Sequence, residues 1–460
     1  MTPASGNNIL HDRDTQFQLH AQTNPHSHEA NGPFIISRGD GPFVFDNEGR
    51  RYLEAMSGLW CASLGFSNKR LAEAAGRAYD MLGYYHSFGG RSTPSAIDAA
   101  HAIAELVPIQ NAHVFFATSG SEAIETMVKL AWLHFKAHGQ GSRRKIIARD
   151  RAFHGSTIFA AALTGLPHMH REFGISQSEI VRVACPDPYR GKEDDESNEM
   201  FASRLARDLE AAILAEGPET IAAFVVEPIN AGAGVIIPPD TYFAEIQPVL
   251  KKYGILLLAD EIVCGFGRTG HWFGSNAFGI QPDMVAMAKG LSSSYFPISA
   301  VAVSSDIYNS VKLINAGGTN FGHGFTNSAH PVGTAIVNEV LAIYSEMQVL
   351  QRVNQLGNRM LSLLNERLSG CDVAGDIRGK GLLAAVELVD DKKSKTSFSQ
   401  ETGVLAAIER RARDKGLILR PQGQAIVFCP PFVVTEAQVD EMVDTVCDIV
   451  LDLRQIVASQ

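Results

Sequence analysis

Four short segments of the sequence carry side chains suited to chemistry, and each follows an apolar run that predicts a β-strand. They are Thr118–Glu122 (TSGSE), Phe153–Gly155 (FHG), Asp260 and Lys289. The expected strands before them span 113–116, 145–148, 255–259 and 284–287. Because open α/β sheets bind ligands at the carboxyl ends of their strands, the four segments are expected to meet in one site.

The segment Thr118–Glu122 stands between an expected strand and an expected helix over 121–137. Free N–H groups at a helix N-terminus attract anions, so the hydroxyls and glycine predict a phosphate cup. The alternative is a serine N-cap with a glutamate in the first helical turn, which requires no ligand. The segment alone does not separate these two interpretations.

The other three segments add an acid, a base and an aromatic ring. Asp260 at the end of a strand could keep a pyridine nitrogen protonated, although a loop or N-cap acid is an equal alternative. Lys289 after a buried strand must lose its charge or form a neutral imine, unless it reaches the surface. Phe153 could stack on a planar cofactor or simply pack in its loop. All four segments stand at the ends of consecutive expected strands. This order favours a single cofactor-binding site over four unrelated structural roles.

The elements that position these residues predict an α/β fold. Continuous apolar runs such as 221–226 (IAAFVV), alternating with helices such as 96–106, predict a mostly parallel sheet covered on both faces. Residues 41–52 alternate around an Asn-Glu-Gly turn and predict a hairpin. We expect an N-terminal segment and hairpin (1–57), a large cofactor-binding domain (58–330) and a smaller α+β domain (331–460) that includes the hairpin.

Composition narrows the class of protein. The 460 residues are 45% hydrophobic and carry 40 basic against 50 acidic side chains, a formal charge of −10, which argues against nucleic-acid or anionic-membrane binding. No apolar run approaches the roughly 18 residues that span a bilayer. The six cysteines lack zinc or C-x-x-C spacing and are expected to be reduced thiols of a soluble cytoplasmic protein. The pairs His26/His28 and His168/His170 have no carboxylate at ligand spacing, so no metal site is expected.

These motifs closely resemble those of the class III (ω-) aminotransferases of fold type I, which depend on pyridoxal 5′-phosphate. The resemblance runs from about residue 41 to the C-terminus. It rests on LLLADEIVCGFGRTG (256–270), MAKGL (287–291), TSGSEA (118–123), FHG (153–155), VEPI (226–229) and HGFTNSAHP (323–331). Similarity to the amine:pyruvate and β-alanine:pyruvate branch rests on SGLW (57–60), YYHSF (84–88) and LRPQGQ (419–424).

The resemblance implies a large domain with a mostly parallel seven-stranded sheet, and it implies a role for each matching residue. Lys289 would form the Schiff base and then move the proton, while Asp260 would bind the ring nitrogen. The other cofactor-binding residues would be Ser119, Gly120, Ser121, Phe153, His154, Glu227 and Ile262, with Phe325 and Thr326 supplied by a second subunit. Substrate-binding residues would be Leu59, Trp60, Phe88, Phe153, Ala231 and Arg420, the last meeting a carboxylate. A homodimer, or a dimer of dimers, would then be required.

Two positions depart from the family pattern. Phe153 replaces a common tyrosine, and losing one hydroxyl hydrogen bond costs about 0.5–1.5 kcal/mol, so cofactor binding should persist in a more apolar pocket. Ala231 and Ala233 add methyl groups where the family has glycine-rich sequence, which leaves substrate preference open.

The expected reaction is a ping-pong transfer from a primary amine or ω-amino acid to pyruvate, through pyridoxamine phosphate (PMP). Alternatives within transaminases are enzymes for taurine, polyamines, diamines or a biotin-pathway intermediate. Another alternative is a racemase, decarboxylase or aminomutase on the same fold. A non-catalytic binding protein is a third alternative, which the presence of both Lys289 and Asp260 disfavours.

Overall fold

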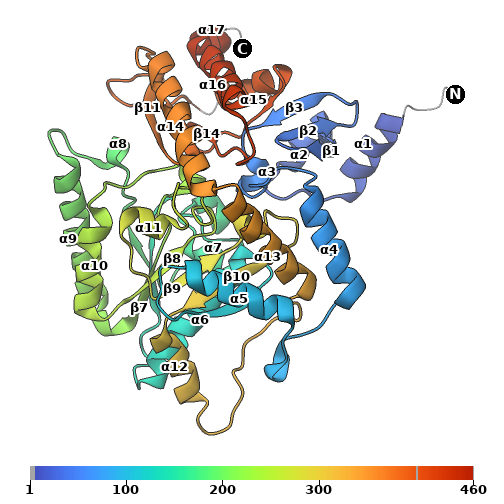
Figure 1. Ribbon diagram of the computed structural model, residues 1–460. Helices are drawn as coiled ribbons and strands as arrows, with labels where there is room; N and C mark the ends of the chain where they lie inside the picture. Colours follow the sequence, from blue (N-terminus) through green and yellow to red (C-terminus); the bar gives the residue numbers. More distant parts are fainter. Residues whose placement is uncertain (1–5, 400–401, 459–460) are drawn as a thin grey trace.

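The computed structural model describes residues 6–399 and 402–458 and is built around a seven-stranded sheet of order β4-β10-β9-β8-β7-β5-β6 (Figure 1). The strands are β4 (His113–Ala117), β5 (Lys145–Arg149), β6 (Ile180–Val183), β7 (Ile221–Val226), β8 (Leu256–Asp260), β9 (Met284–Met287) and β10 (Ser299–Val303). Neighbouring strands are parallel except where β10 pairs antiparallel with β4 and β9. The mostly parallel sheet predicted from the sequence is confirmed.

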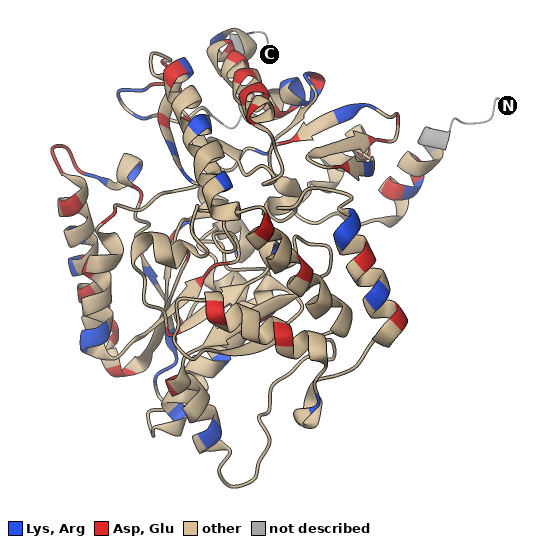
Figure 2. Ribbon diagram, in the orientation of Figure 1, with Lys and Arg blue, Asp and Glu red and all other residues tan. Residues whose placement is uncertain are grey.

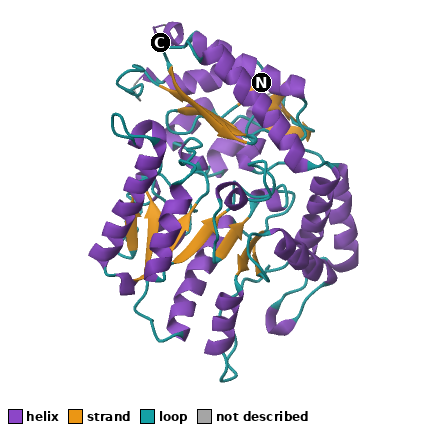
Figure 3. Cartoon of the chain, turned by 60° about the vertical axis from the view of Figure 1, so that its left-hand side comes forward, coloured by secondary structure: helices purple, strands orange, loops and turns teal. Residues whose placement is uncertain are grey.

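Helices cover both faces of this sheet because its strands are apolar on both sides (Figure 3). Along β5, Ile146 packs into the cluster formed with α6 (Gly120–Ala137), whereas Ile147 packs into the cluster formed with α9 (Asn198–Glu216) and α10 (Tyr242–Tyr253). Successive strand residues point to opposite faces, so this alternation places α6 on one side and α9 with α10 on the other.

A second group of helices packs beside the sheet. The helix α13 (Pro331–Glu346) contacts α4 (Lys69–Leu82) and α5 (Pro94–Leu106), and α12 (Ser305–Ile314) contacts α6. The expected boundary at residue 330 therefore falls at the start of a helix that packs on elements of the expected large domain. The domain boundaries stay predictions.

Two smaller sheets lie beyond the carboxyl edge of the large one. The hairpin of β2 (Phe43–Asp46) and β3 (Arg51–Glu54) turns at residues 47–50, as predicted. It joins β1 (Ile36–Asp40) on one side and β13 (Leu417–Ile418), parallel to β3, on the other. The second sheet contains β11 (Ala374–Lys380), β12 (Leu383–Leu388) and β14 (Ala425–Phe428), accompanied by α14 (Val349–Leu368), α15 (Val404–Asp414), α16 (Glu436–Leu451) and α17 (Leu453–Ala458).

The remaining helices are short or lie at the N-terminus. They are α1 (Gly6–Phe17), α2 (Pro25–Asn31), α3 (Ser57–Trp60), α7 (Ile158–Leu163), α8 (Pro188–Gly191) and α11 (Gly274–Phe278). Acidic and basic residues are mixed over the outer helices (Figure 2). Among the described residues, no helix has both the length and the hydropathy needed to cross a bilayer. The six cysteines form no disulfide with one another.

Candidate active site

The four sequence segments meet at the carboxyl edge of the large sheet. A cavity of about 450 Å³ lies there, and side chains or backbone from all four segments line it: Gly120, Ser121, Phe153, His154, Asp260 and Lys289. Because β4, β5, β8 and β9 run in one direction, their carboxyl ends share an edge. The topology thus converts four distant stretches of sequence into one site.

Lys289 leaves the end of β9 in an unusual backbone conformation. Its φ is 48°, in the left-handed region that non-glycine residues seldom adopt, and such strain concentrates at functional sites. Burial lowers the pKa of its ammonium, and the nearby Asp260 carboxylate opposes this shift only in part. A lowered pKa makes the neutral amine, which is the nucleophilic form, easier to reach.

Asp260 is almost completely buried and is held by two donors. His154 Nδ1 lies 2.8 Å from its Oδ2, and the Ile262 N–H donates to its Oδ1 at 3.1 Å. The His154 Nε2 is also buried, with no hydrogen-bond partner among the described residues. A fixed, buried carboxylate at the cavity wall fits the protonated nitrogen of a pyridine ring, because a buried negative charge needs a positive partner.

The start of α6 provides a fitting place for a phosphate. Ser119 caps the helix, accepting from the Glu122 N–H at 3.2 Å, while the Glu122 carboxylate accepts from the Thr118 and Ser119 N–H groups at 2.8 and 3.2 Å. This capping box does not include the N–H groups of Gly120 and Ser121, whose residues line the cavity. The N-cap interpretation is confirmed for Ser119, and the phosphate cup stays a prediction for the next two residues, which line the cavity.

Two glycines let the backbone approach closely around this cup. A Cβ at Gly120 would lie 2.9 Å from Ile262 Cδ1, and a Cβ at Gly155 would lie 2.4 Å from Ser121 Oγ. Gly155 also has a φ of 134°, which side-chain-bearing residues rarely adopt. A side chain at either position would clash with these neighbours, so the two glycines are needed for the close packing at the cavity wall.

Glu227, at the end of β7, fixes the loop that carries Phe153. Its carboxylate accepts from the Phe153 N–H at 3.0 Å and the Ala231 N–H at 3.2 Å. Burial raises its pKa to about 7. Ala231 itself is fully buried in the core behind the cavity wall, whereas Gly232 lines the cavity and lies against Phe153. The structure therefore directs the two extra methyl groups, on Ala231 and Ala233, away from the cavity.

The opposite part of the wall comes from α3 and from the segment after β13. Leu59 and Trp60 line the cavity, and the exposed Arg420 lies at its rim with Gln422. The buried Glu54 accepts N–H hydrogen bonds from Met56, at 3.2 Å, and from Gly58, so it fixes the backbone that delivers Trp60.

Glu54 also predicts a pH dependence of stability. Burial raises its pKa to about 7, so the folded protein keeps a proton that the unfolded chain loses above its usual pKa near 4.3. The free energy of unfolding should therefore fall by up to about 3 kcal/mol as pH rises through this window. In Glu54→Gln, the decrease in Tm between pH 5 and pH 7.5 should be smaller than in the parent. Glu73→Gln, an exposed control on α4, should keep the parent decrease. Equal decreases in Glu54→Gln and the parent would contradict the assignment.

Besides Ala231, four of the predicted site residues do not line this cavity: Ser119, Phe88, Phe325 and Thr326. Ser119 caps α6, as described above. Phe88 packs beside Gly324, and the Thr326 carbonyl accepts from the Tyr84 hydroxyl at 2.9 Å. Phe325 contacts the ring of Phe115. Three of these residues, Phe88, Phe325 and Thr326, lie outside their own chain's cavity. Their contribution to the site of a neighbouring subunit stays a prediction.

Sequence patterns missed several residues of the cavity wall. They are Ala21, Gln22, Gly155, Ser156, Leu166, His168, Gly232, Val263, Cys264, Ala288 and Gln422. Gly155, Val263, Cys264, Ala288 and Gln422 lie inside motifs already recognised, so a signal for them existed. Ala21 and Gln22 come from the N-terminal loop between α1 and α2, where polar sequence offered no such signal.

A fold of this kind, with a buried lysine near a fixed aspartate and a helix N-terminus suited to an anion, is typical of pyridoxal-phosphate-dependent transferases of fold type I. The family model for class-III aminotransferases matches residues 25–450. The chain is 42% identical over 412 residues to gamma aminobutyrate transaminase 1, mitochondrial, of Solanum lycopersicum, covering 89% of this chain and 80% of that one. It is also 42% identical over 413 residues to the vanillin aminotransferase of Capsicum chinense, covering 89% and 90%.

Solved structures of aminotransferases have the same fold as this chain. The omega transaminase of Pseudomonas jessenii in complex with PMP superimposes with a TM-score of 0.95 at 44% identity, covering 98% of this chain and 99% of that one. A PMP-bound aminotransferase from Vibrio fluvialis gives a TM-score of 0.94 at 37% identity, covering 100% and 99%. The chain belongs to the class-III aminotransferases, and its cofactor is pyridoxal 5′-phosphate.

Proposed function

We propose that this aminotransferase moves the amino group of a primary amine or ω-amino acid to pyruvate. The observation that carries the proposal is the composition of the cavity. Near Lys289 it has an apolar wall of Leu59, Trp60 and Phe153, and at its rim it has Arg420. An apolar wall suits an amine without a carboxylate, and a guanidinium suits the carboxylate of the acceptor.

Each residue has a defined task in this reaction. Pyridoxal phosphate, when bound, supplies an electron-withdrawing ring that acidifies the C–H bond beside the donor's nitrogen. Lys289 Nζ holds the cofactor in the resting enzyme and, once displaced by the donor, takes and returns the proton. Asp260 keeps the ring nitrogen protonated, with His154 and the Ile262 N–H fixing the carboxylate. Gly120 and Ser121 would bind the phosphate through their N–H groups.

Engineering of a related enzyme supports the roles of the wall and the rim. A variant of a thermostable omega transaminase, 43% identical to this chain, carries substitutions at a tryptophan, a phenylalanine and an arginine and was engineered for synthesis of bulky amines. Trp60, Phe88 and Arg420 are the same residue types in the same order and at nearly the same spacing. Trp60 and Phe88 are therefore proposed to limit the size of donor that the site accepts, with Arg420 limiting only donors larger than 1-phenylethylamine.

A donor panel tests the proposal, with pyruvate as the fixed acceptor and alanine formation as the readout. We expect kcat/KM for 1-phenylethylamine to be at least comparable to that for β-alanine or a diamine, because the aromatic wall favours aryl groups. Taurine and γ-aminobutyrate belong in the same panel. Rates for 1-phenylethylamine far below those for β-alanine would contradict the aryl-amine preference. Turnover without alanine would instead indicate racemisation, decarboxylation or aminomutase chemistry.

Arg420→Ala should weaken the acceptor half of the reaction selectively. Removing a bidentate partner of a carboxylate costs about 1.5–3 kcal/mol, so KM for pyruvate should rise roughly ten- to a hundredfold. The half-reaction with 1-phenylethylamine, followed by the cofactor absorbance in stopped flow, should change by less than about threefold because that donor carries no carboxylate. An unchanged KM for pyruvate would remove Arg420 from the acceptor site.

A γ-aminobutyrate transaminase is the second candidate. Relatives at 42% identity carry that name, and γ-aminobutyrate is itself an ω-amino acid. The panel distinguishes the two, since a γ-aminobutyrate enzyme should prefer that donor to every aryl amine.

A homodimer is proposed as the minimal active unit. Phe88, Phe325 and Thr326 match family positions that contribute to a neighbouring subunit's site, and Phe88 is exposed at 49% in the single chain. An active monomer in sedimentation velocity would contradict this assembly. A cytoplasmic location stays a prediction.

A further inference from the structure

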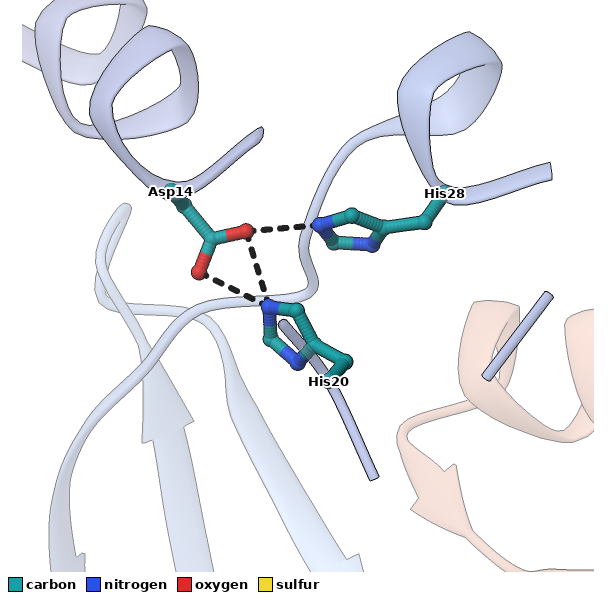
Figure 4. A group of neighbouring side chains, drawn as sticks. All are labelled: Asp14, His20 and His28. Atoms are coloured by element: carbon teal, nitrogen blue, oxygen red, sulfur yellow. Dashed lines mark hydrogen bonds and ion pairs between the residues drawn. The ribbon is translucent and has the colours of Figure 1, made fainter. Parts of the chain in front are cut away.

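The first two helices and the loop between them bring together three metal-ligating side chains that lie between positions 14 and 28 of the sequence. His20 Nε2 lies 3.0 Å from both carboxylate oxygens of Asp14, and His28 Nε2 lies 2.7 Å from Asp14 Oδ1 (Figure 4). One ligand atom from each residue lies within 4.8 Å of the other two. The three side chains are mostly buried, at 17% exposure for Asp14, 28% for His20 and 12% for His28.

We propose that Asp14, His20 and His28 bind one divalent first-row transition-metal ion of the zinc class. Two imidazoles with one carboxylate favour such an ion over Mg²⁺ or Ca²⁺, which prefer oxygen ligands. Zinc bonds near 2.0–2.2 Å at tetrahedral angles would separate the ligand atoms by about 3.3–3.6 Å. The observed separations of 2.7 and 3.0 Å would therefore open by roughly 0.3–0.9 Å, and the two imidazole nitrogens already lie within 4.8 Å of each other. Water would complete the coordination.

This cluster fastens a loop that reaches the active site. His20 directly precedes Ala21 and Gln22, which line the active-site cavity, and Gln22 Nε2 contacts Met169 Sδ at 3.7 Å. Asp14 belongs to α1 and His28 to α2, so an ion would join both ends of the loop to His20 within it. Cross-linking a loop at its ends removes conformational freedom. Metal binding should therefore hold Ala21 and Gln22 against the cavity.

Sequence spacing alone gave no indication of this site. The histidine pair considered there was His26/His28, but His26 is exposed on α2 and takes no part in the cluster. The carboxylate comes from the preceding helix, and the second imidazole comes from the loop between them. The site itself does not depend on the proposed donor or acceptor.

Calorimetric titration of the chelator-treated holoenzyme with zinc chloride tests the proposal. We expect one ion per chain and at least a roughly tenfold loss of affinity in His20→Asn and in His28→Gln. His28→Gln keeps a side-chain N–H near the position of Nε2 that can donate to Asp14, so a purely hydrogen-bonded cluster would survive it, whereas the shorter His20→Asn removes the contact of Nε2. His26→Ala is the matched control on the same helix and should bind zinc as the parent does. Zinc should also slow proteolytic cleavage within residues 18–24 of the parent but not of His28→Gln.

Two results would overturn the metal site. One is no saturable zinc binding by the parent holoenzyme, which would leave a hydrogen-bonded cluster only. The other is zinc affinity that is equal in the parent, His20→Asn and His28→Gln, which would place the ion elsewhere. Cofactor absorbance and Tm, measured without metal, verify that each variant is folded. Substituting Co²⁺ for zinc gives a visible absorbance that the same two variants should lose.

Discussion

Replacing Lys289 with alanine is expected to lower kcat for transamination by about four orders of magnitude. A positioned general acid/base contributes up to about 10⁴-fold, equivalent to roughly 5.5 kcal/mol of activation free energy. No other lysine lines the cavity, so within the described residues no second ammonium can take its place.

Mass spectrometry separates loss of chemistry from loss of folding. Borohydride reduction of the parent should leave the cofactor covalently attached to the peptide that contains Lys289, and the variant should retain none. Lys251→Ala, at an exposed position on α10, should keep both the attachment and the parent kcat. Cofactor attached to a different lysine of the parent would remove Lys289 from its central role.

Asp260→Asn is expected to lower kcat by about 10²–10³-fold, the usual effect of removing one preorganised electrostatic contact at a reacting group. The amide keeps the size of the side chain and can still accept from the Ile262 N–H, but it cannot hold a positive charge on the ring nitrogen. Each pKa unit lost by that nitrogen corresponds to about 1.4 kcal/mol. The substitution should therefore slow proton transfer more than it weakens cofactor binding.

Stopped-flow measurement of the half-reaction with 1-phenylethylamine tests this expectation. In Asp260→Asn the deuterium isotope effect at the transferred position should increase, because proton transfer becomes more strongly rate-limiting, and the cofactor spectrum should shift. Asp240→Asn changes an exposed carboxylate outside the cavity and should behave as the parent. A variant with full activity would mean that Asp260 does not face the ring nitrogen.

Much of the site could be predicted from the sequence because its parts are local. An apolar run followed by a polar residue predicts both a strand and its carboxyl end, which placed Lys289 and Asp260 correctly at one edge of the sheet. The glycine and hydroxyls of Thr118–Glu122 predicted a helix N-terminus in the same way, and the capping box formed there. These features depend on residues within a few positions of one another, so they can be recognised in the sequence without knowledge of the fold.

Contacts between distant segments were decided only by the tertiary structure. Whether Ala231 or Gly232 faces the cavity depends on how one short turn packs against Phe153 and the core. The antiparallel direction of β10 and the pairing of β3 with β13 depend on long-range topology. The meeting of Asp14 with His20 and His28 depends on how α1 packs beside α2. Spacing along the chain determines which face of an element a side chain occupies, but only packing determines what lies opposite it.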